Sequence, residues 1–125
     1  MNDIVDERVA RASAISAAGG IEAALEGSTL PESLHLTLSE AVVLGLLRQG
    51  VSRFVGIFGH GSTDLGEVLR VYQDAGLVRT YAVRNEVEAA HAATALRWAT
   101  GEKAAVFTSI GPGALQALAG SLAAA

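Results

Sequence analysis

The stretch AAVFTSIGPG, residues 104–113, holds an apolar strand and the turn that ends it. Residues 104–108 have the composition of a short buried strand. The Gly-Pro-Gly turn at 111–113 marks the end of that strand and opens a helix at Gly113. A strand that passes through a tight turn into a helix is the repeating unit of α/β folds, so this stretch decides the fold class.

Two further strands of this kind precede the stretch. Residues 54–58 and 78–83 predict strands, and the segments that follow them, 64–75 and 86–100, predict helices. Alternating strands and helices imply right-handed crossovers and an open parallel sheet flanked by helices. Three strands make a narrow sheet, and no strand follows the last helix. We therefore expect a truncated piece of a longer α/β domain.

The first 35 residues differ from the rest of the chain. Apolar residues from Ile4 to Ala12 predict a weakly amphipathic helix, and residues 27–31 have the composition of a linker. Thr37 to Glu40 then fits a capping box, in which each side chain bonds the other residue's amide. We divide the chain into an N-terminal extension and linker, 1–35, and a partial domain, 36–125. The extension is expected to be adaptable or a surface helix rather than a functional arm.

The composition argues against several classes of protein. Nine basic and thirteen acidic residues give a formal net charge of −4 without a basic stripe, so we expect no nucleic-acid partner. No stretch approaches the roughly 20 apolar residues of a membrane span, and we expect no membrane partner. The acidic N-terminus lacks a signal pattern and there is no cysteine, so a cytoplasmic location is expected. The apolar run from Ala114 to Ala125 predicts a buried helix.

Three loops follow the three predicted strands. They are residues 59–63, 84–86 and 109–113. Open parallel sheets bind ligands at the carboxyl ends of their strands, so these loops should converge on one edge. That convergence is a stronger signal of a binding site than any single motif in the chain.

Taken alone, the polar residues in these loops have ordinary explanations. Glu86 fits a helix-start acid placed for the helix dipole, and the glycines at 111–113 fit a tight turn. His60 lies between two glycines, where a role in hydrogen bonding or proton transfer and a passive role are equally favoured. His91 lies on an apolar helical stripe and is expected in the core. With His35, the three histidines are too scattered for a metal site.

Two segments together, Arg84-Asn85-Glu86 and Thr108 to Gly113, resemble the pyrimidine-binding domain of thiamine-diphosphate enzymes of the acetolactate synthase type. The resemblance covers roughly Leu36 to Ala125. The loop Gly59-His60-Gly61-Ser62 resembles that of the trihydroxycyclohexane-dione hydrolases of inositol breakdown, because the common synthase and decarboxylase relatives carry a Pro-Gly pair there. The resemblance implies the α/β fold of that domain and thiamine diphosphate as cofactor.

The resemblance also implies roles for individual residues. Glu86 would hold a proton toward the aminopyrimidine ring and so activate the cofactor, which acts as an electron sink. A carboxyl that stays protonated near neutral pH needs an apolar crevice, and pairing of Glu86 with Arg84 would weaken that role. Catalytic roles are therefore predicted for Glu86 and His60. Cofactor contacts are predicted for Gly59, Glu86 and the turn Gly111, Pro112 and Gly113.

The motif that holds magnesium and the diphosphate in this family, Gly-Asp-Gly with a downstream asparagine, is absent from the sequence. The resemblance thus implies Mg²⁺ ligands outside this chain, on a diphosphate-binding domain of the same protein or of a partner subunit. It further implies a homo-oligomer, a small carbonyl substrate and an isolated chain without activity. The reaction alternatives are hydrolysis of a cyclic dione, carboligation and 2-oxo acid decarboxylation. A non-catalytic interaction domain that retains the fold is the alternative from another class.

Overall fold

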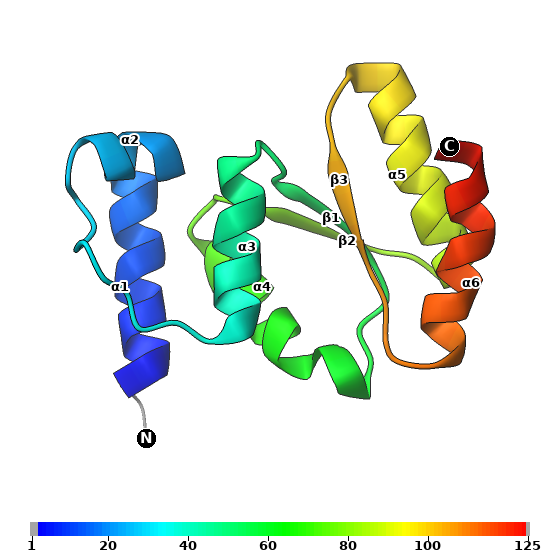
Figure 1. Cartoon of the computed structure of the whole chain (residues 1–125), viewed down its shortest axis with the longest axis horizontal. Coiled ribbons are helices and arrows are strands. Elements are labelled where there is room, and N and C mark those ends of the chain that lie inside the picture. Colours follow the sequence, from blue (N-terminus) through cyan, green and yellow to red (C-terminus); the bar gives the residue numbers. More distant parts are fainter. Residues whose placement is uncertain (1–2, 125) are drawn as a thin grey trace.

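The computed structural model describes residues 3–124, and its centre is a three-stranded parallel sheet (Figure 1). The strands are β1 (Arg53–Gly56), β2 (Arg79–Ala82) and β3 (Ala104–Phe107), in the spatial order β2-β1-β3. Both neighbours of β1 run parallel to it. This confirms the predicted α/β class and the parallel sheet, with each strand slightly shorter than its apolar run.

The helices form layers on both sides of this sheet. Helices α3 and α4 lie on one face, α5 and α6 lie on the other, and α1 and α2 pack outside α3 and α4 (Figure 1). The segments predicted to be helical are confirmed. Their bounds are α1 (Asp3–Ala17), α2 (Ile21–Glu26), α3 (Leu38–Arg48), α4 (Thr63–Asp74), α5 (Glu86–Thr100) and α6 (Pro112–Ser121), with short 3₁₀ turns η1 (His60–Ser62) and η2 (Leu122–Ala124).

The capping box predicted at the start of α3 forms only by half. Thr37 Oγ1 accepts a hydrogen bond from the Glu40 amide at 3.3 Å, as expected. The Glu40 carboxylate does not reach back. It is fully buried and instead accepts from Arg11 at 2.5 Å and from the Tyr72 hydroxyl at 3.0 Å. A carboxylate between two guanidinium groups gains more from charge pairing than from one amide.

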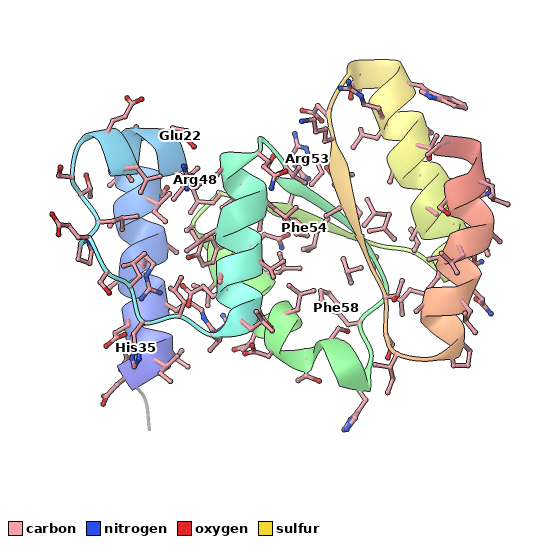
Figure 2. The ribbon with its side chains drawn as sticks, in the orientation of Figure 1. Glu22, His35, Arg48, Arg53, Phe54 and Phe58 are labelled. Atoms are coloured by element: carbon pink, nitrogen blue, oxygen red, sulfur yellow. The ribbon has the colours of Figure 1, made fainter. Side chains whose placement is uncertain are left out.

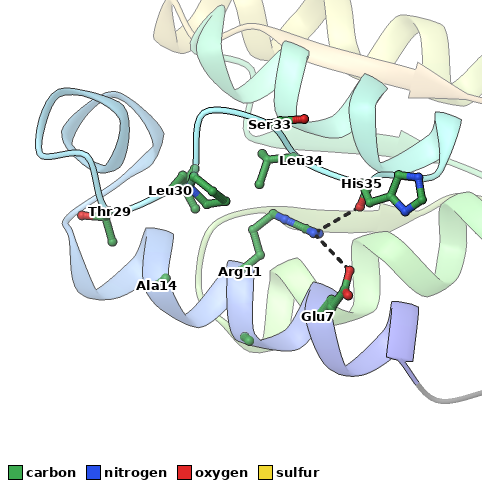
Figure 3. Close-up of a pocket in the computed structure, with 10 residues that line it drawn as sticks. Glu7, Arg11, Ala14, Thr29, Leu30, Ser33, Leu34 and His35 are labelled. Carbon is green, nitrogen blue, oxygen red and sulfur yellow. Dashed lines mark hydrogen bonds and ion pairs between the residues drawn. The ribbon is translucent and has the colours of Figure 1, made fainter.

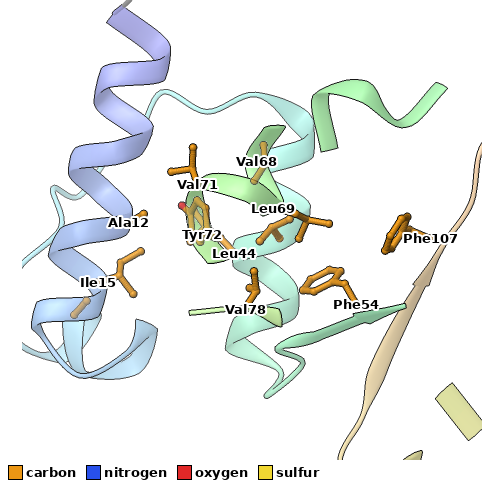
Figure 4. Packing of buried hydrophobic residues seen from close by; sticks show 12 residues of the cluster. Ala12, Ile15, Leu44, Phe54, Val68, Leu69, Val71, Tyr72, Val78 and Phe107 are labelled. Carbon is orange, nitrogen blue, oxygen red and sulfur yellow. The ribbon is translucent and has the colours of Figure 1, made fainter. Parts of the chain in front are cut away.

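The hydrophobic core lies between the sheet and the α3–α4 layer (Figure 4). Helix α1 contributes Ala12 and Ile15, which are almost completely buried, and α2 contributes Ala24. Residues 3–35 thus share a core with the rest of the chain. The expectation of an adaptable extension or a surface helix did not include this docking, in which α1 adds two buried arginines to a short apolar face. The proposed division of the chain at residue 36 stays a prediction.

The opposite face of the sheet is thinly covered, which corrects two predictions. The run from Ala114 onward was expected to be buried, yet Leu115 and Leu118 are 68% and 61% exposed. On α5, His91 is exposed rather than in the core, and Trp98 is 75% exposed. Helix α6 packs on α5 rather than on the sheet, so within residues 3–124 nothing covers these side chains. None of the described helices has the length and apolar character needed to cross a membrane.

Candidate functional site

The order of the strands creates a switch point at their carboxyl ends. Strand β1 leads into α4 on one face of the sheet, whereas its neighbour β3 leads into α6 on the other face (Figure 1). Loops that diverge from adjacent parallel strands leave the crevice in which α/β proteins bind ligands. The candidate site therefore lies where the loops after β1, β2 and β3 meet.

The loop after β1 is held from both ends. Phe58 packs its ring against Phe107 of β3, with the ring centroids 4.4 Å apart, and it lies beside the α3–α4 layer in Figure 2. Ser62 Oγ accepts from the Gly59 amide at 2.9 Å, and Thr63 Oγ1 donates to the His60 carbonyl oxygen at 3.1 Å. The His60 side chain is exposed at the tip of this loop. Its position suits contact with a ligand rather than packing in the core.

The loops after β1 and β3 touch each other. Gly59 lies against Ser109, and Gly61 lies against the side chain of Ile110, so closely that a methyl group at either glycine would overlap these atoms. Gly111 has φ +66°, a backbone conformation that side chains other than glycine rarely adopt. The glycines are therefore required by the way the two loops approach. Ser109 is a lining residue to which the sequence analysis gave no role, although it lies within the quoted turn.

Glu86, the first residue of α5, lies against the first turn of α6. A Cβ atom placed on Gly113 would be 2.5 Å from Glu86 Oε1. A side chain at position 113 would require the Glu86 carboxylate to move. The structure thus brings Glu86 together with the Gly111–Gly113 turn, as the convergence of the loops predicted. No hydrogen bond or ion pair of residues 3–124 joins Glu86 to His60.

The neighbours of Glu86 pair with one another and leave its carboxylate free. Asn85 Oδ1 accepts from the Glu88 amide at 2.9 Å and caps α5. Arg84 pairs with Glu88, whose carboxylate accepts from the Arg84 amide at 3.2 Å and lies 3.4 Å from its guanidinium group. Among residues 3–124, Glu86 has neither a hydrogen bond nor an ion pair through its side chain. The helix start is therefore capped without Glu86.

The surroundings of Glu86 are partly apolar. Ala89 and Ala90 are buried, while Val83, Val87 and Glu86 itself are intermediate in exposure. Apolar residues thus follow Glu86 on α5, and the apolar crevice around it stays a prediction. The described cavities lie elsewhere. One of about 460 Å³ lies between α1 and residues 29–35, where Arg11 contacts Glu7 and the His35 carbonyl (Figure 3).

A buried ionic cluster that was not predicted from the sequence joins α1, α3 and α4, and it consists of Arg8, Arg11, Glu40 and Tyr72. Glu40 accepts from both arginines and from the Tyr72 hydroxyl. Burial raises the pKa of Tyr72, and the negative charge of Glu40 raises it further. The available signal was the spacing of Arg8 and Arg11, which places them one turn apart on the buried face of α1.

Comparison with known proteins supports a single family. Residues 36–125 match the family described as thiamine pyrophosphate enzyme, N-terminal TPP binding domain. The chain is 32% identical over 80 residues to the acetolactate synthase large subunit of Pyropia yezoensis and 36% identical over 85 residues to the acetolactate synthase isozyme 3 large subunit of Escherichia coli K12. These matches cover 64% and 68% of this chain. The chain spans only 14% of the length of either relative.

Proposed function

The chain belongs to the thiamine pyrophosphate enzymes, through their N-terminal TPP-binding domain, and we propose that it is the pyrimidine-binding part of an enzyme that makes or breaks carbon–carbon bonds next to a carbonyl group. The observation that carries this proposal is the free carboxylate of Glu86. It lies against Gly113 while Arg84, Asn85 and Glu88 satisfy one another.

The residues around Glu86 fit an aminopyrimidine. A flat ring needs close approach of the backbone and one carboxyl group without another partner. Gly111 leaves space for the first, since nothing lies within 4 Å of the position a Cβ atom would take, and Glu86 provides the second. Glu86, Gly59 and the turn Gly111–Gly113 would hold the ring. When bound, thiamine diphosphate supplies a nucleophilic carbon and an electron sink for bonds beside a carbonyl group.

The role of Glu86 is to hold a proton on its carboxyl group toward a ring nitrogen. Arg84 would oppose this if it paired with Glu86, because a nearby cation favours the charged carboxylate. Its pairing with Glu88 at 3.4 Å directs that cation elsewhere. Ala89 and Ala90, three and four residues further along α5, are buried and make that part of the helix apolar. This arrangement supports Glu86 as the proton donor and acceptor.

His60 is the second residue for which we propose a catalytic role. Its side chain is exposed at the same edge of the sheet as the glycine turn, on a loop that touches the one after β3. An imidazole both donates and accepts hydrogen bonds, so His60 would orient the substrate carbonyl or move a proton. The required partner groups would come from the substrate.

The rest of the site would come from another region. Mg²⁺ and the diphosphate would be held by a diphosphate-binding domain of the same protein or of a partner subunit in a homo-oligomer. Exposed apolar residues on the loop after β3 and along α6 and η2 support such a partner, namely Ile110, Leu115, Leu118 and Leu122. Apolar patches of this kind commonly mark interaction surfaces. Because the site is completed by that other region, the isolated chain would be inactive. We further propose a cytoplasmic location for the whole enzyme.

The test of Glu86 uses the complete enzyme and exchange of the thiazolium proton of the bound cofactor, followed by NMR. Glu86→Gln should slow this exchange by about 10²–10⁴-fold, because an amide does not exchange protons as a carboxyl group does. Glu67→Gln, at an exposed carboxylate of α4 that pairs with Arg70, is the control and should exchange as the wild type does. An unchanged rate in Glu86→Gln removes Glu86 from the mechanism.

Two reactions are candidates for the complete enzyme. Similarity to two proteins named acetolactate synthase large subunit favours a carboligase. The exposed His60 between two glycines favours the second candidate, hydrolysis of an oxygen-rich cyclic dione. Paired steady-state kinetics of His60→Ala separate them. Loss of one neutral hydrogen bond lowers kcat/KM by about three- to tenfold. If the enzyme is the hydrolase, His60→Ala should lower kcat/KM more for the dione than for pyruvate.

A further inference from the structure

The guanidinium group of Arg8 bridges the starts of two helices. Its Nε lies 3.4 Å from Glu40 Oε2, and one terminal nitrogen donates to Thr37 Oγ1 at 3.3 Å. The same nitrogen lies 3.7 Å from Asp64 Oδ1. Thr37 and Glu40 form the start of α3, and Asp64 lies in the first turn of α4. One side chain of α1 therefore connects the starts of α3 and α4.

Charge balance favours this arrangement. The side chains of Arg8 and Arg11 are 3% and 7% exposed, and arginine stays charged under all ordinary conditions. Glu40, which is completely buried, supplies one negative charge for these two positive charges. Two acids that are more than half exposed supply the others, Asp64 beside Arg8 and Glu7 beside Arg11. Because an uncompensated buried charge is strongly unfavourable, Arg8 stabilises the position of Asp64.

Asp64 lies immediately beyond the loop that carries His60. Thr63, the residue before Asp64, donates from Oγ1 to the His60 carbonyl oxygen. Ser62 accepts from the Gly59 amide and donates to the Gly59 carbonyl oxygen at 3.2 Å. The loop is therefore closed on itself and attached to the turn of α4 that Arg8 contacts. A displacement of that turn displaces His60 as well.

We propose that Arg8 is a positioning residue for the candidate site: through Asp64 it holds the first turn of α4, and with it the His60 loop, beside the loop after β3. Helix α1 then supports the site although none of its residues lies there. The proposal rests on the proposed function only for the role of His60. The coupling between Arg8 and the loop is a property of the chain without cofactor.

Amide hydrogen exchange of the chain without cofactor tests the coupling. Asp64→Asn removes the exposed partner and keeps the buried cluster, so the fold should persist. Exchange of amides 59–66 should rise about threefold or more, as expected for the loss of a partly buried ion pair. The matched control is Glu22→Gln, which removes the Glu22–Arg48 pair of the same 3.7 Å length between α2 and α3 (Figure 2). That variant should leave amides 59–66 unchanged.

A double-mutant cycle separates the contact from a general effect of charge on α4, because an acid in a first turn also interacts with the helix dipole. In the Arg8→Met background, Asp64→Asn should raise the exchange rate of amides 59–66 only by the amount that the loss of the dipole interaction explains. Glu40 keeps Arg11 and Tyr72 as partners in Arg8→Met. Arg8→Gln, which removes the charge but keeps a polar group near Glu40, serves instead if the methionine variant does not fold.

The proposal is overturned if Asp64→Asn raises the exchange of amides 59–66 equally in the wild-type chain and in Arg8→Met. It is also overturned if this rise is no larger than the one that Glu22→Gln causes. The outcome is independent of cofactor chemistry. Coupled exchange together with a wild-type cofactor assay for Glu86→Gln would uphold the positioning role of Arg8 and reject the proposed function.

Discussion

On one face of the sheet, Val68, Leu69 and Tyr72 of α4 are fully buried, whereas on the other face Leu115 and Leu118 of α6 are mostly exposed. The first face also holds two buried arginines with their carboxylate partner, and the second holds the free carboxylate of Glu86. The comparison separates two tasks. The α3–α4 side supplies stability, and the α5–α6 side presents groups that this chain does not itself satisfy.

The largest expected effect is on the ionic cluster of the packed face. Glu40→Ala removes the one completely buried carboxylate of residues 3–124 and leaves Arg8 and Arg11 with the largely exposed acids Asp64 and Glu7. Breaking a buried ion pair typically costs about 3–5 kcal/mol, so the free energy of unfolding should fall by that amount. Urea denaturation measures it. If Glu40→Ala lowers the free energy of unfolding no more than Glu88→Gln on the open face does, the two faces do not differ in the stability that their charged groups supply.

Truncation of apolar side chains compares the faces directly. Ile15→Ala on the packed face should lower the free energy of unfolding by about 2–5 kcal/mol, because it leaves a cavity in the core. Leu118→Ala on the open face should change it by less than about 0.5 kcal/mol in the monomeric chain. Equal losses at the two positions would indicate that α6 packs as tightly as α1, contrary to the exposure of Leu118.

The buried tyrosine should give the packed face a dependence on alkaline pH. Burial and Glu40 raise the pKa of Tyr72. When the pH exceeds the ordinary tyrosine pKa of 10.0, this tyrosine therefore ionises in the unfolded chain but stays protonated in the folded chain. The stabilising effect is complete below pH 10 and declines as the pH rises above it, by at most about 1.4 kcal/mol per pH unit. Tyr72→Phe should remove this decline. Tyr81→Phe, at an exposed position, should retain it.

The smallest effect on stability, but a visible one on assembly, is expected from the exposed leucines of α6. Leu115 and Leu118 should make the chain associate as its concentration rises. The double variant Leu115→Ser with Leu118→Ser should associate less, with the unfolding free energy nearly unchanged. Light scattering over a dilution series measures both proteins. A wild-type chain that stays monomeric at all concentrations would contradict the interpretation of the open face as an interaction surface.

The two faces also differ in how well the sequence predicts them. Strand positions and the convergence of the three loops follow from local patterns and from the geometry of parallel sheets. The docking of α1 does not, because Arg8 and Arg11 resemble solvent-exposed residues until Glu40 is placed between them. The predicted burial of His91 fails for the opposite reason. Its helical stripe is apolar, but the other elements within residues 3–124 leave the His91 side chain exposed.

Site residues show the same limit. The spacing of Arg84, Asn85 and Glu86 indicates a helix start after a strand, and this is confirmed. It does not indicate which acid Arg84 contacts, because Glu86 and Glu88 are both within its reach. That choice depends on the side chain of Asn85, which caps the amide of Glu88 and brings the carboxylate of Glu88 toward Arg84.

The central claim is that the open face carries one part of a cofactor site. Calorimetric titration of the isolated chain with thiamine diphosphate, with and without Mg²⁺, tests it most directly. We predict weak binding that does not change when Mg²⁺ is omitted, because the ligands for the metal and the diphosphate lie outside this chain. Sub-micromolar binding that requires Mg²⁺ would contradict the account, because the chain would then hold the complete cofactor site.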